Sequence, residues 1–230
     1  MGFCVLMERV DLLALLFPKK CVACNQLGSY FCSNCLAKIE YFSDQVCPEC
    51  YKRSLSGKTH PYCQKQLGLD GVVSLTNYKT PVREFIQSLK YRFATDLLTE
   101  FSDKFVFAKD LLPAATWDLL PVPLHQSRQN YRGFNQAELL GEIVARKFGL
   151  ELKKDVIERA VASKSQVGLT KTRRKANTNA VFAINQPVVG GSFYLFDDVW
   201  TSGATLKSAA KELKKAGAKS VWGLTLAHPR

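Results

Sequence analysis

The feature that most constrains the fold is a stretch near the carboxyl end, whose residues 193–205 read FYLFDDVWTSGAT. The apolar run over 192–196 predicts a buried strand. Residues 206–216 have the apolar spacing of one helix face, Gly217 is placed to end that helix as a C-cap, and 221–227 predict a second strand. This order of strand, acidic pair, turn, helix and strand is typical of an α/β protein with parallel strands.

The turn of this unit has the composition of an anion-binding site. The first backbone N–H groups of a helix lack intrahelical partners and carry the positive end of the helix dipole, so they attract phosphate. Gly203 permits a close approach of the backbone, and the hydroxyls of Thr201, Ser202 and Thr205 add donors. The residues alone leave open a plain helix-capping turn beside a solvated acidic pair.

The whole string resembles the phosphoribosyl-pyrophosphate (PRPP) loop of type I phosphoribosyltransferases, which has an apolar strand, Asp-Asp, an apolar pair and a Thr/Ser-rich turn with glycine. The resemblance implies that Asp197 and Asp198, our candidate catalytic residues, bind the ribose hydroxyls of PRPP in the presence of Mg²⁺. Trp200 is bulkier than the family pattern, and we interpret it as a packing residue. The residues that would wrap the 5′-phosphate are Thr201, Ser202, Gly203, Ala204 and Thr205.

The amino-terminal apolar segment does not have the character of a membrane anchor. Residues 5–17 are interrupted by Glu8, Arg9 and Asp11 and are too few to span a bilayer. We expect an amphipathic helix in a cytoplasmic protein that is not an integral membrane protein. The 230 residues suffice for one ordinary core and a small appendage.

The formal charge of +12 is unevenly distributed. Residues 1–70 contain 8 Lys/Arg against 6 Asp/Glu, so +10 of the net charge falls on residues 71–230. A basic surface there suits a polyanion, either a pyrophosphate ester or a nucleic acid. Solvated lysine-rich helices are the alternative.

The cysteines define a separate amino-terminal unit, because all eight precede residue 64. Seven of them and one histidine form four pairs at two-residue spacing, which is the spacing that tetrahedral zinc requires. A disulfide framework would require secretion, and we find no signal peptide. The predicted zinc ligands are Cys21, Cys24, Cys32, Cys35, Cys47, Cys50, His60 and Cys63.

Spacing does not determine how these ligands share one or two zinc ions. The first four thiolates form a complete set, whereas His60 stands where a fourth thiolate is usual and could be an ordinary surface histidine. The pairs could also interleave, with alternate knuckles sharing an ion. Cys4 is isolated and reads as a buried small residue. We expect the zinc to be structural, because small zinc modules fold only with metal.

The composition changes near residue 69, and we predict a zinc-binding unit over 1–68 and a larger domain over 69–230. Strands are predicted over 72–78 and 117–124. Two helices are predicted between these strands, one that starts at Pro81 and one over 96–107.

A second basic loop follows the strand predicted over 117–124, before a helix predicted over 135–148. It contains Arg128, Arg132 and Gly133. Such a loop lies at the carboxyl edge of a parallel sheet, where open α/β folds bind ligands, and the arginine fork matches two phosphate oxygens. A solvated basic loop is the alternative.

The sequence PVPLH…RGFNQAELL at 121–140 resembles that of the ComF competence proteins, which join a zinc module to a phosphoribosyltransferase-like domain. The resemblance implies that the loop after 117–124 binds pyrophosphate. It also makes the segment around 162–179, which lacks apolar periodicity, a hood over the reacting centre rather than an exposed linker. The hood residues that match the family are Gln166, Arg173, Arg174 and Asn177.

The predicted fold is α/β, with a mostly parallel twisted sheet flanked by helices and the zinc module packed against it. The family implies a role in natural transformation, handling incoming single-stranded DNA at the inner face of the membrane with a ComF-type helicase and DNA-processing proteins. The alternative is an active phosphoribosyltransferase, in which an amine or nucleobase displaces pyrophosphate from PRPP. No Ser-His-Asp or Cys-His arrangement competes with this chemistry, and the sequence leaves a homodimer open.

Overall fold

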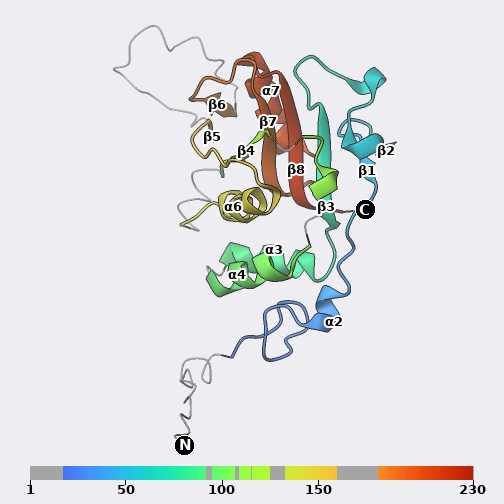
Figure 1. Ribbon diagram of the computed structural model, residues 1–230, viewed down its shortest axis with the longest axis vertical. Helices are drawn as coiled ribbons and strands as arrows, with labels where there is room; N and C mark the ends of the chain where they lie inside the picture. The colour runs from blue at the N-terminus through green and yellow to red at the C-terminus, as the bar shows by residue number, and fades with distance from the viewer. Residues whose placement is uncertain are drawn as a thin grey trace, which may run out of the picture.

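The computed structural model describes residues 18–91, 95–106, 109–114, 116–124, 133–159 and 181–229. At its centre is a four-stranded sheet in the order β3-β8-β7-β4 (Figure 1). All three pairings in this sheet are parallel. The strands are β3 (Gly71–Asn77), β4 (Asp118–Pro121), β7 (Ser192–Val199) and β8 (Ser220–His228). The predicted α/β fold, with a parallel sheet, flanking helices and an amino-terminal module, is confirmed.

Helices cover the sheet on both faces. Tyr194 and Phe196 of β7 belong to one apolar core, whereas Phe193 and Leu195 belong to the other. A strand buried on both faces has a continuous apolar run, which is why 192–196 has such a clear strand signal. The helices of the first core are α3 (Val82–Tyr91), α4 (Thr95–Lys104) and α6 (Gln136–Phe148), and α7 (Ala204–Lys215) covers the second.

The ends of α6 follow local capping rules. The side chain of Asn135 accepts a hydrogen bond of 3.1 Å from the N–H of Ala137, which satisfies one donor of the first turn. Gly149 follows the helix in the left-handed conformation, with φ of 74°. The helix predicted over 135–148 is therefore confirmed, with Asn135 as its N-cap.

Strand β7 is longer than predicted and includes both acidic residues. We expected it to end at Phe196, but Asp197 pairs with Thr225 of β8 and the ladder continues to Val199. The neighbouring strand β8 runs to His228, so it offers pairing partners beyond the apolar segment. Tertiary pairing thus extends the strand through residues whose own preference is for turns.

The ends of two further helices compare differently with prediction. Helix α7 ends at Lys215 with Ala216 as its C-cap, and Gly217 closes it directly afterwards in the left-handed conformation, with φ of 97°. The helix predicted over 96–107 is α4, which ends at Lys104. The helix predicted over 5–17 lies outside the described residues.

The remaining elements are short. Strands β1 and β2 form an antiparallel pair in the amino-terminal module, and β5 and β6 form another beside α7. Their bounds, with those of the small helices, are α2 (Ser33–Leu36), β1 (Gln45–Val46), β2 (Arg53–Ser54), η1 (Leu55–Gly57), η2 (Pro61–Cys63), η3 (Lys109–Leu111), β5 (Ile157–Arg159) and β6 (Phe182–Ile184).

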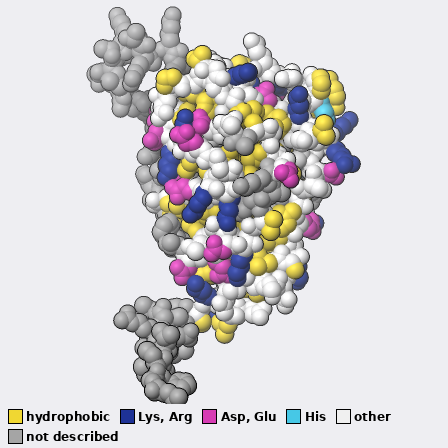
Figure 2. All heavy atoms as spheres, in the orientation of Figure 1, with side chains coloured by type: hydrophobic (Ala, Val, Ile, Leu, Met, Phe, Trp, Pro, Cys, Tyr) yellow, Lys and Arg dark blue, Asp and Glu magenta, His cyan; other side chains and the backbone are white. Residues whose placement is uncertain are grey.

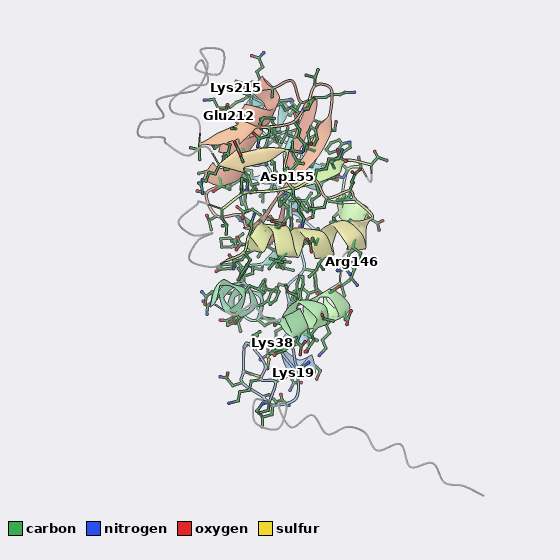
Figure 3. All side chains as sticks on the ribbon, turned by 90° about the vertical axis from the view of Figure 1, so that its left-hand side faces the viewer. Lys19, Lys38, Arg146, Asp155, Glu212 and Lys215 are labelled. Carbon is green, nitrogen blue, oxygen red and sulfur yellow. The ribbon has the colours of Figure 1, made fainter. Side chains whose placement is uncertain are left out.

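The first half of the amino-terminal module packs against α3 and α4. Phe31 is fully buried, and its ring lies 5.2 Å from that of Phe85 and 5.3 Å from that of Phe105. In Figure 3, Lys19 and Lys38 of this half lie at one end of the molecule, beyond α3 and α4. The carboxyl end of α7 lies toward the opposite end.

The second half of the module lies along β3. The side-chain amide of Gln45 donates to the carbonyl of Ser74 at 3.1 Å and accepts from its N–H at 2.8 Å, so it behaves as an added strand residue. Residue 58 also bridges to Gly71 in antiparallel fashion. The boundary that we place at residue 69 stays a prediction.

Candidate functional site

The first candidate metal site is formed by four cysteines. The sulfur atoms of Cys21, Cys24, Cys32 and Cys35 all lie within 4.8 Å of one another. Those of Cys24 and Cys32 are 3.6 Å apart. Two thiolates on one tetrahedral zinc, each about 2.3 Å from the ion, lie about 3.8 Å apart. The four thiols therefore fit a structural zinc ion.

Two backbone turns build this site. The N–H of Asn25 bonds the carbonyl of Cys21 at 2.9 Å, and the N–H of Cys35 bonds that of Cys32 at 3.1 Å. Burial acts to raise the pKa of Cys21, but backbone hydrogen bonds outweigh it and lower this pKa to about 6. Burial and the neighbouring thiols raise the pKa of Cys35 to about 12. Four thiols this close together cannot all become thiolates unless a cation compensates their charge. Such a cluster is therefore typical of a metal site.

The second candidate site consists of Cys47, Cys50, His60 and Cys63, whose ligand atoms also lie within 4.8 Å of one another. The sulfur of Cys50 lies 3.3 Å from Nδ1 of His60. The other ring nitrogen, Nε2, lies 3.2 Å from the carbonyl oxygen of Arg53. A proton on Nε2, donated to that carbonyl, leaves Nδ1 with a lone pair that can bind metal, and this nitrogen also lies 3.1 Å from the hydroxyl of Tyr62. His60 thus completes the set.

The pairing of ligands is sequential. Each ion site takes two consecutive pairs, and the interleaved arrangement that spacing left open is not observed among the described residues. The structure therefore supports two structural zinc sites. Cys4 lies outside the described residues.

The acidic pair lies at the carboxyl end of β7, next to β8. Asp197 and Asp198 are both half-buried, and the N–H of Asp198 donates to Oδ1 of Asp197 at 2.9 Å. Half-buried carboxylates keep enough access to accept hydrogen bonds from a ligand.

The turn after β7 leads directly into α7. Gly203 is the N-cap of α7 with φ of 67° and offers no side-chain acceptor to the first turn. Among the described residues, the substitute is a long hydrogen bond of 3.4 Å, from the N–H of Ala204 to the hydroxyl of Ser202. The first turn of α7 is thus poorly capped by its own chain, which leaves donors for an anion.

Trp200 lies beneath this turn and restricts it to glycine. Its side chain is buried, with 1% exposed, in agreement with a packing role. A Cβ added to Gly203 would lie 2.2 Å from the indole ring. Both the positive φ and the ring therefore require glycine at 203.

The second basic loop starts from the strand next to β7. Pro121 of β4 pairs with Phe196, and the N–H of Val122 bonds the carbonyl of Phe196 at 2.9 Å. The loop therefore leaves the sheet at the same edge as the acidic pair. Gly133 is described, with φ of 73°.

The arginines of that loop, Arg128 and Arg132, lie outside the described residues. The same holds for the hood residues Gln166, Arg173, Arg174 and Asn177. Their roles stay predictions.

One contact to the turn between β7 and α7 was not predicted from sequence. The hydroxyl of Tyr51, in the second zinc site's knuckle, donates to the carbonyl of Ser202 at 2.7 Å. The two residues are 151 positions apart, so no local pattern indicates the contact. The one available signal was a tyrosine directly after a Cys-x-x-Cys pair, where glycine or asparagine fits a left-handed turn.

The fold and the metal sites define the class of the protein: an α/β domain with a parallel sheet joined to a double zinc module. Residues 12–66 match the family of the double zinc ribbon domain. Among the described residues, no helix has the length and apolar character needed to cross a membrane.

Relatives match most of the chain. It is 29% identical over 197 residues to competence protein ComFC of Streptococcus pneumoniae, covering 84% of this chain and 85% of the relative. It is 29% identical over 224 residues to competence protein F of Haemophilus influenzae, covering 90% of each. DNA utilization protein YhgH of Escherichia coli K12 is 28% identical over 221 residues, 90% of this chain and 96% of that one. The predicted resemblance to ComF competence proteins is confirmed.

Proposed function

We propose that the chain acts in DNA uptake or use through a domain that binds PRPP, or a related phosphoribosyl ligand, together with Mg²⁺. One observation carries the ligand part: Asp197 and Asp198, near the end of β7, are followed after a short turn by the poorly capped start of α7. Carboxylates accept hydrogen bonds from ribose hydroxyls, and helix N–H groups bind phosphate. The two halves of a sugar phosphate therefore find matching groups within one turn.

Each part of the site has a separate task in this proposal. Asp197 and Asp198 orient the ribose, and the backbone of 201–205 with its hydroxyls binds the 5′-phosphate. Arg128 and Arg132 neutralise the pyrophosphate from the neighbouring strand's loop. Mg²⁺, when bound with the ligand, supplies charge neutralisation at the pyrophosphate oxygens.

The DNA part of the proposal rests on the names of the relatives, which are competence proteins and a DNA utilization protein. It includes a cytoplasmic location at the inner face of the membrane, binding of single-stranded DNA, and cooperation with a ComF-type helicase. The formal charge of +12 favours a polyanionic partner.

Calorimetry of the zinc-loaded protein with PRPP and Mg²⁺ tests the ligand site. Wild type should bind in the micromolar range, and the double variant Asp197→Asn/Asp198→Asn should lose binding. A matched control, Asp103→Asn/Asp155→Asn, removes two charges from exposed positions and should bind as wild type. Absence of wild-type binding, or equal affinity of the Asp197/Asp198 variant, would contradict the proposal.

Catalysis is the second candidate function, and the same acidic strand end favours it. A transferase of this kind needs no protein nucleophile, because the acceptor amine or nucleobase attacks the anomeric carbon and pyrophosphate leaves. Release of pyrophosphate from PRPP, assayed with each nucleobase and with ammonia, tests it. Binding without release for any acceptor would leave a binding domain and contradict the enzyme reading.

A further inference from the structure

The second zinc site contacts the proposed phosphate loop through Tyr51. Besides its 2.7 Å hydrogen bond to the carbonyl of Ser202, its ring lies 6.3 Å from that of Trp200, the residue beneath the loop. The ammonium of Lys207, on the second turn of α7, lies 5.3 Å from the Tyr51 ring centre and 5.8 Å from that of Trp200. One side chain of the knuckle therefore touches both the loop and the helix that the loop begins.

The backbone at Tyr51 is unfavourable for a tyrosine. Its φ is 59°, and the matching position of the first site, directly after Cys24, holds Asn25 with φ of 62°. Asparagine tolerates this left-handed conformation, whereas most other side chains cost about 1–2 kcal/mol there. If only the backbone of this turn mattered, asparagine or glycine at position 51 would be less strained than tyrosine. The contact with the loop offers a reason for tyrosine at this position.

The hydrogen bond acts on the peptide group that opens the proposed anion site. The peptide between Ser202 and Gly203 is trans, so its C=O and N–H point in opposite directions. By holding the Ser202 oxygen on the side of the knuckle, Tyr51 directs the Gly203 N–H away from it. We propose that Tyr51 is a positioning residue for the loop 201–204, so that the second zinc site forms one wall of the ligand site.

Charges across the contact support the same role. A lysine near a helix N-terminus is unfavourable next to the helix dipole unless an acidic group compensates it. Glu49, between the two knuckle cysteines, lies 3.8 Å from Lys207 and also binds Lys65 at 2.6 Å. The knuckle thus supplies an acidic partner, a hydrogen-bond donor and an aromatic face to the start of α7.

This inference rests on the proposed PRPP site, and its test separates the two. Hydrogen–deuterium exchange of the loop without ligand reports the contact, and calorimetry with PRPP and Mg²⁺ reports its effect on binding. Tyr51→Phe removes only the hydroxyl and should raise exchange of amides 201–206 while weakening PRPP about three- to tenfold, as expected for one lost hydrogen bond. Tyr51→Asn should do the same and keep its zinc, since asparagine suits the turn.

Tyr41→Phe is the matched control, because the Tyr41 hydroxyl accepts a 3.1 Å hydrogen bond from the N–H of Val106, on the same module but in a different contact. It should leave loop exchange and PRPP affinity unchanged. The inference would be overturned if Tyr51→Phe left the exchange of amides 201–206 at the wild-type rate. It would also be overturned if these amides exchanged faster while the affinity for PRPP stayed unchanged. If wild type fails to bind PRPP, the proposed function fails, and loop exchange alone decides whether Tyr51 holds the loop.

Discussion

The carboxylate of Glu100, on α4, accepts a hydrogen bond of 2.9 Å from the backbone N–H of Phe31, beside the first zinc site. It also accepts one of 3.1 Å from the N–H of Tyr30. Lys104 completes the contact, because its ammonium donates to Glu100 at 2.6 Å and to the carbonyl of Phe31 at 2.8 Å. The Glu100–Lys104 pair therefore binds the first half of the zinc module to α4, beside the ion pair of Lys19 with Asp96 at 3.2 Å and the packing of Phe31.

Glu100→Gln should lower the free energy of unfolding at pH 7 by about 1–2 kcal/mol, because charge-assisted hydrogen bonds become neutral ones. Burial acts to raise the pKa of Glu100, but the bonds from Lys104, Phe31 and Tyr30 outweigh it and hold this pKa below the ordinary 4.5. The charged form thus contributes stability above pH 4.5, and this contribution is lost as the pH falls through the lowered pKa. Urea unfolding at pH 7 and near pH 3 measures both values.

Glu142→Gln is the control for this experiment. Glu142 is more exposed and shares Lys154 with Glu138, so its loss should change stability by less than about 0.5 kcal/mol. A deficit in Glu100→Gln that is equal at both pH values would contradict the electrostatic explanation.

Gly203→Ala should be far more damaging than the same change at another left-handed glycine. At Gly190, φ is 74° and an added Cβ meets nothing within 4 Å, so alanine costs only backbone strain, about 1–2 kcal/mol. At Gly203 the Cβ also collides with the buried Trp200 ring, which adds about 1–3 kcal/mol. Thermal unfolding of the two variants measures the difference, and equal losses would show that the ring yields without cost.

Wild-type protein should contain two zinc ions per chain. Cys24→Ser and Cys63→Ser remove one ligand from different sites, so each should retain about one ion and lose thermal stability. Cys4→Ser, which changes a cysteine outside both ligand sets, should retain two. Elemental analysis of dialysed protein gives the counts. A single ion in wild type would contradict two independent sites.

Binding of single-stranded DNA should weaken with salt. The described residues hold 22 Lys/Arg against 18 Asp/Glu, and on the face shown in Figure 2 both signs are interspersed. Most of the net +12 therefore belongs to other parts of the sequence, and residues 160–180 alone contain five Lys/Arg and no Asp/Glu. A slope near zero in a plot of the logarithm of the binding constant against the logarithm of the salt concentration would contradict DNA binding.

Neutralising the five basic residues of 160–180 should reduce that salt slope by up to about 3.5, at about 0.7 per lost phosphate contact on a single strand. Glutamine replaces Lys164, Lys171, Arg173, Arg174 and Lys175. The control removes five exposed charges elsewhere: Lys38, Lys58, Arg146, Lys211 and Lys219. An equal reduction in both variants would show that only net charge matters, and that 160–180 has no special role.

Local sequence patterns predicted most of the fold. Strand β7 and helix α7 follow from an apolar run and a periodic apolar face, because both signals depend on neighbours a few residues apart. The eight candidate zinc ligands were likewise recognisable from spacing, since each Cys-x-x-Cys or His-x-x-Cys pair is a local turn.

Relations between distant segments required the tertiary structure. The pairing of the zinc ligands depends on how the chain folds back between knuckles. The extension of β7 through Asp197 depends on β8 as its neighbour.

The sequence by itself determined the class of fold, the candidate metal ligands and the turn between β7 and α7, because these are encoded in composition and short spacing. Only the tertiary structure decided that Tyr51 lies against Ser202, and that Glu100 binds the backbone of Phe31 beside the first candidate zinc site. Those contacts join residues 151 and 69 positions apart. They depend on the packing of whole elements, which no local pattern specifies.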